Sequence, residues 1–98
     1  MSNQQRNQAR PLFELGRTLA TPGAVSALAT LNASPVPLLS RHHRGDWGDL
    51  DAVDQQTNND ALTQGGRIFS AYQVETVRFW VITEADRSAT TILLPEEY

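Results

Sequence analysis

The sequence contains no cysteine and no lysine among its 98 residues. Without cysteine, disulfide bonds, thiolate nucleophiles and structural zinc sites of the cysteine type are excluded. Because all eight basic residues are arginine, a side-chain Schiff base and a phosphate-loop lysine are excluded as well. Several enzyme classes are therefore ruled out before any motif is considered.

Long apolar runs are also absent, since no stretch approaches the roughly 18 apolar residues of a membrane span. The polar N-terminal segment differs from a secretory signal, so we expect a cytoplasmic protein without a membrane segment. The formal net charge of −3 is too mild for a broad basic face or for an acidic mimic of DNA. Nucleic acid is therefore not the expected partner.

The composition that is present suits one folded domain. Hydrophobic residues make up 40% of the chain and charged residues 19%, which is enough apolar material for one core. Residues 1–10 are rich in glutamine, asparagine and arginine, and we interpret them as a flexible arm. Residues 11–98 are predicted to form a single domain.

The first half of the domain predicts one strand and three helices. Partial alternation over residues 12–20 indicates a short strand interrupted by glycine. Threonine or serine followed by proline begins helices at Thr21 and Ser34. A third helix starts around Asp49 to Asp51 and stops at two glycines; we expect it to bury Leu50, Val53, Ala61 and Leu62.

The second half changes to a period of two, which is typical of strands. Residues 68–74, 77–83 and 89–94 predict three strands joined by tight turns, the first at Glu75-Thr76 and the second at residues 85–88. The fold class is therefore α+β: a short N-terminal strand, three helices, and a C-terminal three-stranded antiparallel meander with the helices packed on one side.

Several motifs resemble a family of small, largely uncharacterised "plasmid-related" proteins of plasmids and integrative mobile elements. The matching segments are Gly45-Asp46-Trp47-Gly48-Asp49-Leu50, residues 82–98, Leu15-Gly16-Arg17, residues 20–24, and Ser70-Ala71-Tyr72. The resemblance covers roughly residues 12–98. It implies an accessory protein of a mobile genetic element, with a role in countering or modulating host defence of the restriction or CRISPR type.

A cluster of polar residues at positions 42–49 has two interpretations. Functionally, His42, Asp46 and Asp49 could hold a divalent metal, or His42 and Asp46 could share a proton. Structurally, the aspartates cap a turn while Trp47 closes the edge of the core. No established metal motif has this spacing, so we favour the structural interpretation and expect no cofactor.

A second cluster occupies the turn at residues 83–88. Glu84, Asp86 and Arg87 could bind a polar ligand together with His42 and Asp46, which requires the 42–49 and 84–88 loops to meet in one cleft. The favoured alternative is an ordinary turn in which Asp86 bonds local amides and Arg87 pairs with an acidic neighbour, such as one on the third helix. No nucleophile elbow or catalytic triad pattern occurs, so catalysis is not the leading hypothesis.

Aromatic residues and arginines on the predicted sheet suggest a binding surface. Alternation puts Trp80 and Arg78 on the side opposite Phe79, so the two sides of the sheet differ in character. We predict that Trp80, Arg78 and Tyr72, together with the loop of Trp47, form a protein-binding face, with a homodimer as one option. Nucleic-acid binding by the aromatic residues Phe69, Tyr72, Phe79 and Trp80, with phosphate contacts from Arg67 and Arg78, is the less favoured alternative.

Overall fold

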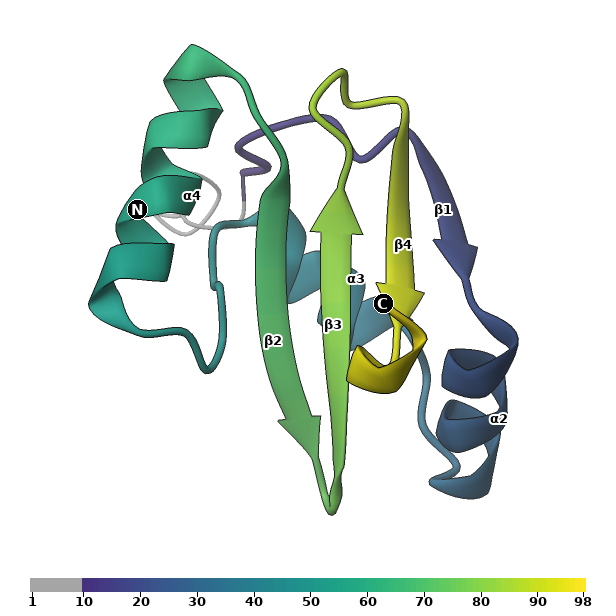
Figure 1. The fold of residues 1–98 in the computed structure, drawn as a ribbon. Coiled ribbons are helices and arrows are strands. Elements are labelled where there is room, and N and C mark those ends of the chain that lie inside the picture. Colours follow the sequence, from purple (N-terminus) through teal and green to yellow (C-terminus); the bar gives the residue numbers. More distant parts are fainter. Residues whose placement is uncertain (1–9) are drawn as a thin grey trace, which may run out of the picture.

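The computed structural model describes residues 10–98. The predicted flexible arm therefore lies, except for Arg10, outside the described residues. The elements in chain order are β1 (Arg17–Ala20), α2 (Pro22–Thr30), α3 (Val36–His43), α4 (Ala52–Gln64), β2 (Ile68–Val74), β3 (Val77–Thr83), β4 (Ala89–Leu93) and the short 3₁₀ helix η1 (Pro95–Glu97). The predicted α+β class, with this order of elements, is confirmed (Figure 1).

The strands form one four-stranded sheet in the order β1-β4-β3-β2. β2, β3 and β4 make the expected antiparallel meander, in which Tyr72 lies opposite Phe79. β1 differs from expectation because it adds to this meander as a parallel neighbour of β4, so the sheet is mixed. The long helical connection between β1 and the meander makes this parallel pairing possible, since parallel strands need a crossover.

α2 and α4 begin where the capping residues predict, whereas α3 begins one residue later than expected, with Pro35 at its N-cap and no side-chain cap. The Thr21 side chain accepts a hydrogen bond from the amide of Ala24, and Pro22 occupies the first turn of α2. At the start of α4, the carboxylate of Asp51 accepts the amide of Asp54 at 2.8 Å. These side chains satisfy amides that have no partner inside the helix.

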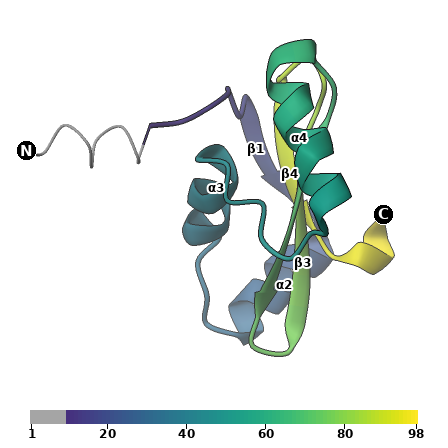
Figure 2. The same cartoon turned by 90° about the vertical axis from the view of Figure 1, so that its left-hand side faces the viewer.

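The helices are distributed differently from the predicted single layer. Figure 2 shows α2 and α3 on one side of the sheet, the C-terminal η1 on the other side, and α4 along the β2 edge. The expectation that all three helices pack on one side was therefore wrong for α4. Because α4 lies beside the sheet, Val53 is 73% exposed, and the buried residues of α4 are Asn58 and Ala61.

The main core lies between the sheet and the helices α2 and α3. It is made of Ala24, Leu28, Leu38, Tyr72, Phe79, Val81 and Ile92. A smaller cluster of Trp47, Ala61 and Ile68 joins α4 to the sheet. The alternation of β2 and β3 thus places one apolar side of each strand against helices, as burial of apolar surface requires.

The β2 edge of the sheet is closed by polar groups rather than by another strand. The side-chain amide of Asn58 donates to the carbonyl of Phe69 at 2.6 Å and accepts its N–H at 3.0 Å, as a neighbouring strand would. Farther along β2, the loop after α3 forms a β-bridge between Gly48 and Ala71. A sheet edge closed in this way cannot pair with another chain at these positions.

Candidate functional site

The side of the sheet that faces away from α2 and α3 is here called the open face. It carries Phe69 of β2, Arg78, Trp80 and Ile82 of β3, and Thr91 and Leu93 of β4, as the register requires. The predicted placement of Trp80 and Arg78 on this side is confirmed. Tyr72 was wrongly assigned to it, since it pairs with Phe79 on the helix-covered side and is only 1% exposed.

A hollow of about 310 Å³ lies on the open face, lined by Arg67, Phe69, Trp80, Ile82 and Tyr98. The Trp80 ring meets the Phe69 ring edge-on at a centroid distance of 5.0 Å and the Tyr98 ring at 5.6 Å. The three aromatic rings therefore form one contiguous part of the lining of the hollow. This set is called the aromatic hollow below.

Tyr98 is the member of the aromatic hollow that sequence reasoning missed. It follows η1, and the turn of chain from Leu94 to Glu97 carries its ring back over the open face beside Trp80. Its side chain is 69% exposed. No sequence period marks it, because its position depends on the turn after the last strand and not on strand alternation.

One arginine, Arg67, lines the aromatic hollow, and a second, Arg78, lies on the same face of the sheet. The guanidinium of Arg67 lies 5.7 Å from the centroid of the Tyr98 ring, within the range of a cation–π contact. Arg78 is paired loosely with Asp49 at 3.8 Å, and both side chains are substantially exposed. The open face therefore combines apolar rings with cationic groups that retain access to solvent.

Trp47 belongs to the core and not to an exposed loop. It is 4% exposed, and its indole N–H donates to the side-chain oxygen of Asn59 at 3.1 Å. The prediction that Trp47 contributes to a docking surface is wrong in this structure, because α4 covers the ring. The structural interpretation of Trp47 is the one that the contacts support.

His42 lies at the centre of a buried polar chain. Its Nδ1 atom is 2.6 Å from the hydroxyl of Ser70, and its Nε2 atom is 2.9 Å from the hydroxyl of Thr83. The Thr83 hydroxyl in turn contacts that of Thr90 at 2.6 Å, and Thr90 donates to the carbonyl of Leu15 at 2.7 Å. The four side chains that form this series of hydrogen bonds, those of His42, Ser70, Thr83 and Thr90, are fully buried.

The carbonyl of Leu15 fixes the direction of every proton in this chain. Because the single hydroxyl proton of Thr90 goes to that carbonyl, the contact between the two threonines requires Thr83 to donate. Thr83 must then accept from the Nε2–H of His42, which leaves Nδ1 bare. Ser70 therefore donates its proton to Nδ1 of a neutral imidazole.

The arrangement of Ser70 and His42 resembles a nucleophile beside its base, but both side chains are completely buried. A substrate cannot reach the hydroxyl in this state. Burial, with a smaller contribution from the neighbouring charge of His43, lowers the pKa of His42 to about 3, which keeps the imidazole neutral. The pair therefore serves as a satisfied polar core.

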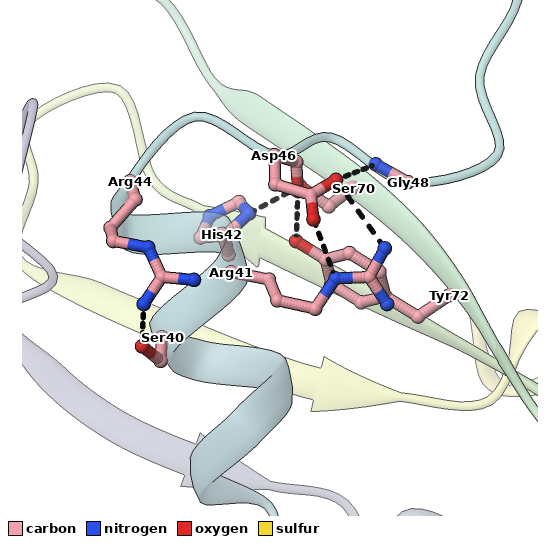
Figure 3. A network of polar contacts seen from close by, with 8 residues as sticks. All are labelled: Ser40, Arg41, His42, Arg44, Asp46, Gly48, Ser70 and Tyr72. Atoms are coloured by element: carbon pink, nitrogen blue, oxygen red, sulfur yellow. Dashed lines mark hydrogen bonds and ion pairs between the residues drawn. The ribbon is translucent and has the colours of Figure 1, made fainter. Parts of the chain in front are cut away.

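Asp46 holds the loop after α3 in place (Figure 3). Its carboxylate accepts from Nε of Arg41 at 2.7 Å and from the amide of Gly48 at 3.2 Å. The Arg41 hydrogen bond is the main reason that the pKa of Asp46 is lowered. The Tyr72 hydroxyl donates to the Asp46 carbonyl at 2.6 Å, so this loop is fastened to β2.

These contacts contradict the two functional interpretations of residues 42–49. His42 and Asp46 do not share a proton, because both ring nitrogens of His42 are bound to hydroxyls. Asp49 lies near Arg78 rather than near a histidine. Within residues 10–98, no group of three or more histidine, aspartate or glutamate side chains is placed to hold a metal ion.

The turn at residues 84–88 also has a structural role. Asp86 accepts the amide of Ser88 at 3.0 Å, as the predicted turn requires. Arg87 reaches the third helix, as expected, but it binds backbone carbonyls and no acid: it donates to the carbonyls of Ala61 and Gly66 at 3.0 and 2.6 Å. Its guanidinium thereby supplies donors to the C-terminal end of α4.

The 42–49 and 84–88 loops do not form a common cleft. The first pairs with Ala71 in the middle of β2 and contacts Thr83 through the buried side chain of His42, while the second follows Thr83 at the end of β3 (Figure 1). No hydrogen bond or ion pair joins these two loops in the described part of the chain. The side chains of the predicted shared ligand site are engaged separately: His42 contacts buried hydroxyls, Asp46 binds Arg41, and Arg87 binds backbone carbonyls.

No family model, curated protein or solved structure matches this chain. The resemblance to plasmid-related proteins thus stays a prediction that depends on the sequence motifs. None of the helices in residues 10–98 is both long and apolar enough to cross a membrane.

Proposed function

We propose that the chain is a small binding domain that recognises a partner protein through the aromatic hollow of its open face. The observation that carries this proposal is the grouping of Phe69, Trp80 and Tyr98 around a hollow of the open face, the side of the sheet that α2 and α3 do not cover (Figure 2). Tryptophan, tyrosine and arginine are the residues that most often dominate interface energies. An apolar patch left on the surface of a small domain is commonly a contact site.

The charges around the aromatic hollow define the partner segment. Arg67 lines the hollow and Arg78 lies on the same face, so the complementary segment inserts a bulky apolar side chain flanked by carboxylates. The apolar side chain gains from burial between rings, and the carboxylates gain charge-assisted hydrogen bonds to guanidinium groups. The mobile-element context implied by the resemblance makes a host restriction or CRISPR enzyme the candidate partner.

The test is a pull-down from the host, followed by titration of the captured protein in purified form. Tyr98→Ala and Arg67→Glu change exposed or rim positions, so they should weaken binding at least about tenfold without lowering the melting temperature. Val25→Ala is the matched control, because Val25 is an exposed apolar residue of α2, which lies on the other side of the sheet. Unchanged binding by both Tyr98→Ala and Arg67→Glu would refute the proposal.

A salt titration with single-stranded DNA separates this proposal from nucleic-acid binding. Stacked rings beside arginines can also bind bases, and such binding weakens steeply as salt increases. Tight, salt-sensitive binding of the oligonucleotide that is lost in the Tyr98→Ala variant would show that the open face binds nucleic acid and not a partner protein. We expect no binding at physiological salt, given the net charge of −3.

A further inference from the structure

β1 leaves an unpaired row of backbone groups along its outer side. The amide of Arg17 donates to the carbonyl of Ser88, and that of Thr21 donates to Ile92, both at 3.0 Å. Because backbone groups alternate in direction along a strand, Thr18 and Ala20 turn their N–H and C=O groups away from the sheet. In the described part of the chain, no strand lies beyond β1.

This edge lacks the protection that the opposite edge has. β2 is closed by the Asn58 side chain and by the bridge at Gly48. All four residues of β1 are exposed; they include one charged side chain, that of Arg17, and no proline. Figure 1 shows α2 beyond the end of β1 rather than beside it. Since natural sheets usually block exposed edges, the open side of β1 is suited to receive a strand.

We propose that this strand is β1 of a second copy of the chain, paired antiparallel about a two-fold axis at Leu19. In this register Thr18 lies opposite Ala20 of the second copy, and the two residues exchange both backbone hydrogen bonds. The axis repeats the same pair on its other side. The two four-stranded sheets then become one continuous sheet, with both open faces on the same side.

The side chains of β1 fit this register. Leu19 is 41% exposed and would lie opposite itself at a non-hydrogen-bonded position, where side chains are closest. Thr18 and Ala20, which share the other side of the strand, are small enough to lie opposite each other. The pairing therefore covers an exposed leucine on each copy without steric conflict.

Charge complementarity distinguishes a second copy from an unrelated strand. In the same register Arg17 lies opposite Thr21 of the other copy, and the Thr21 hydroxyl donates to the carboxylate of Glu97. Arg17 thus approaches Glu97 of the second copy. Within residues 10–98 the Arg17 side chain has no ion-pair partner of its own, so the second copy supplies one to each arginine.

A single introduced cysteine tests the register, because the chain has none of its own. At a non-hydrogen-bonded antiparallel pair the Cα atoms are about 4.5 Å apart, which lies within the range of a disulfide. Under mild oxidation Leu19→Cys should form a covalent dimer at least about tenfold faster than Val25→Cys, since association raises the effective thiol concentration. Equal rates for the two variants would overturn the proposal.

Proline at position 18 tests the backbone pairing. The Thr18 N–H points outward, so Thr18→Pro removes a donor to the second copy and none to β4. Sedimentation of the wild type and of Thr18→Val should show a concentration-dependent increase above the 10.8 kDa monomer, whereas Thr18→Pro should sediment as a monomer. A wild type that stays monomeric at every concentration would contradict the proposal.

Two further variants keep the result clear. Should Thr18→Pro unfold, Arg17→Glu provides the same test through repulsion from Glu97 of the second copy, and it leaves the backbone unchanged. Tyr98→Ala removes a ring of the aromatic hollow but should leave the cross-linking rate of Leu19→Cys unaltered. These variants therefore test the dimer and the binding of a partner protein independently of each other.

Discussion

Nδ1 of His42 accepts the hydroxyl proton of Ser70 at 2.6 Å, and neither side chain reaches solvent. The imidazole must stay neutral to do so, because protonated Nδ1 could no longer accept this bond. Burial is the main reason that the pKa of His42 falls from 6.5 to about 3. The free energy of unfolding of a chain with a neutral buried histidine therefore depends on pH in a defined direction.

We predict that stability falls as the pH is lowered below 6.5. Between pH 6.5 and 3 the unfolded chain binds a proton at His42 that the folded chain does not, so acid favours unfolding. The free energy of unfolding should decrease by about 2 kcal/mol between roughly pH 7.5 and roughly pH 5. Urea denaturation at several pH values measures this decrease.

The histidine variants identify the responsible group. His42→Gln should lower stability at all pH values but should remove most of this slope, whereas His43→Gln should retain it. The carboxyl groups of Asp46, Asp86 and Glu97, whose pKa values are lowered, act with the same sign only below about pH 4.5. A slope that persists in His42→Gln would show that another group is responsible.

Alanine at Gly48 should destabilise the chain more than alanine at Gly65. Both glycines have a positive φ, +75° and +85°, so each substitution costs about 1–3 kcal/mol in backbone strain. A Cβ at Gly48 would also overlap the carbonyl of Ala71 and the ring of Tyr72, whereas at Gly65 it meets open space. Urea unfolding of both variants measures the difference, and equal losses would contradict this account.

The order of elements could be predicted from the sequence because its signals are local. Capping residues such as Thr21 set helix starts, and alternation separates Phe79 from Trp80. The same alternation, combined with the Tyr72–Phe79 register, would have excluded Tyr72 from the open face. That register requires the hairpin at residues 75–76 to be counted residue by residue.

The features of the structure that could not be predicted from the sequence depend on contacts between segments that are distant in the chain. The hydroxyls of Ser70, Thr83 and Thr90 gather around His42 only after the sheet has formed. α4 has few apolar side chains to show which surface it covers, and it contacts β2 through the polar Asn58 as well as through the small Ala61. Sequence patterns identify apolar faces but not such polar partners.

Removal of the Asn58 amide should loosen the β2 edge. Asn58→Ala leaves the N–H and C=O of Phe69 without their partner, which should cost about 1–3 kcal/mol. The Phe69 amide should also exchange with solvent faster, as hydrogen exchange measures. Gln56→Ala is the control on the exposed side of the same helix, and it should change neither quantity. Slow exchange at Phe69 in Asn58→Ala would show that β2 keeps its protection without the side chain.

Arg87 gives a final prediction, because its interpretation as a binding residue and its structural role lead to different outcomes. Its guanidinium donates to the carbonyls of Ala61 and Gly66, so Arg87→Met leaves these groups without a charged donor and should cost about 1.5–3 kcal/mol. Arg87→Lys keeps the charge but loses the planar set of donors, so it should recover only part of this loss. A variant Arg87→Met that melts like the wild type, yet loses the partner of the open face, would instead make Arg87 a contact residue.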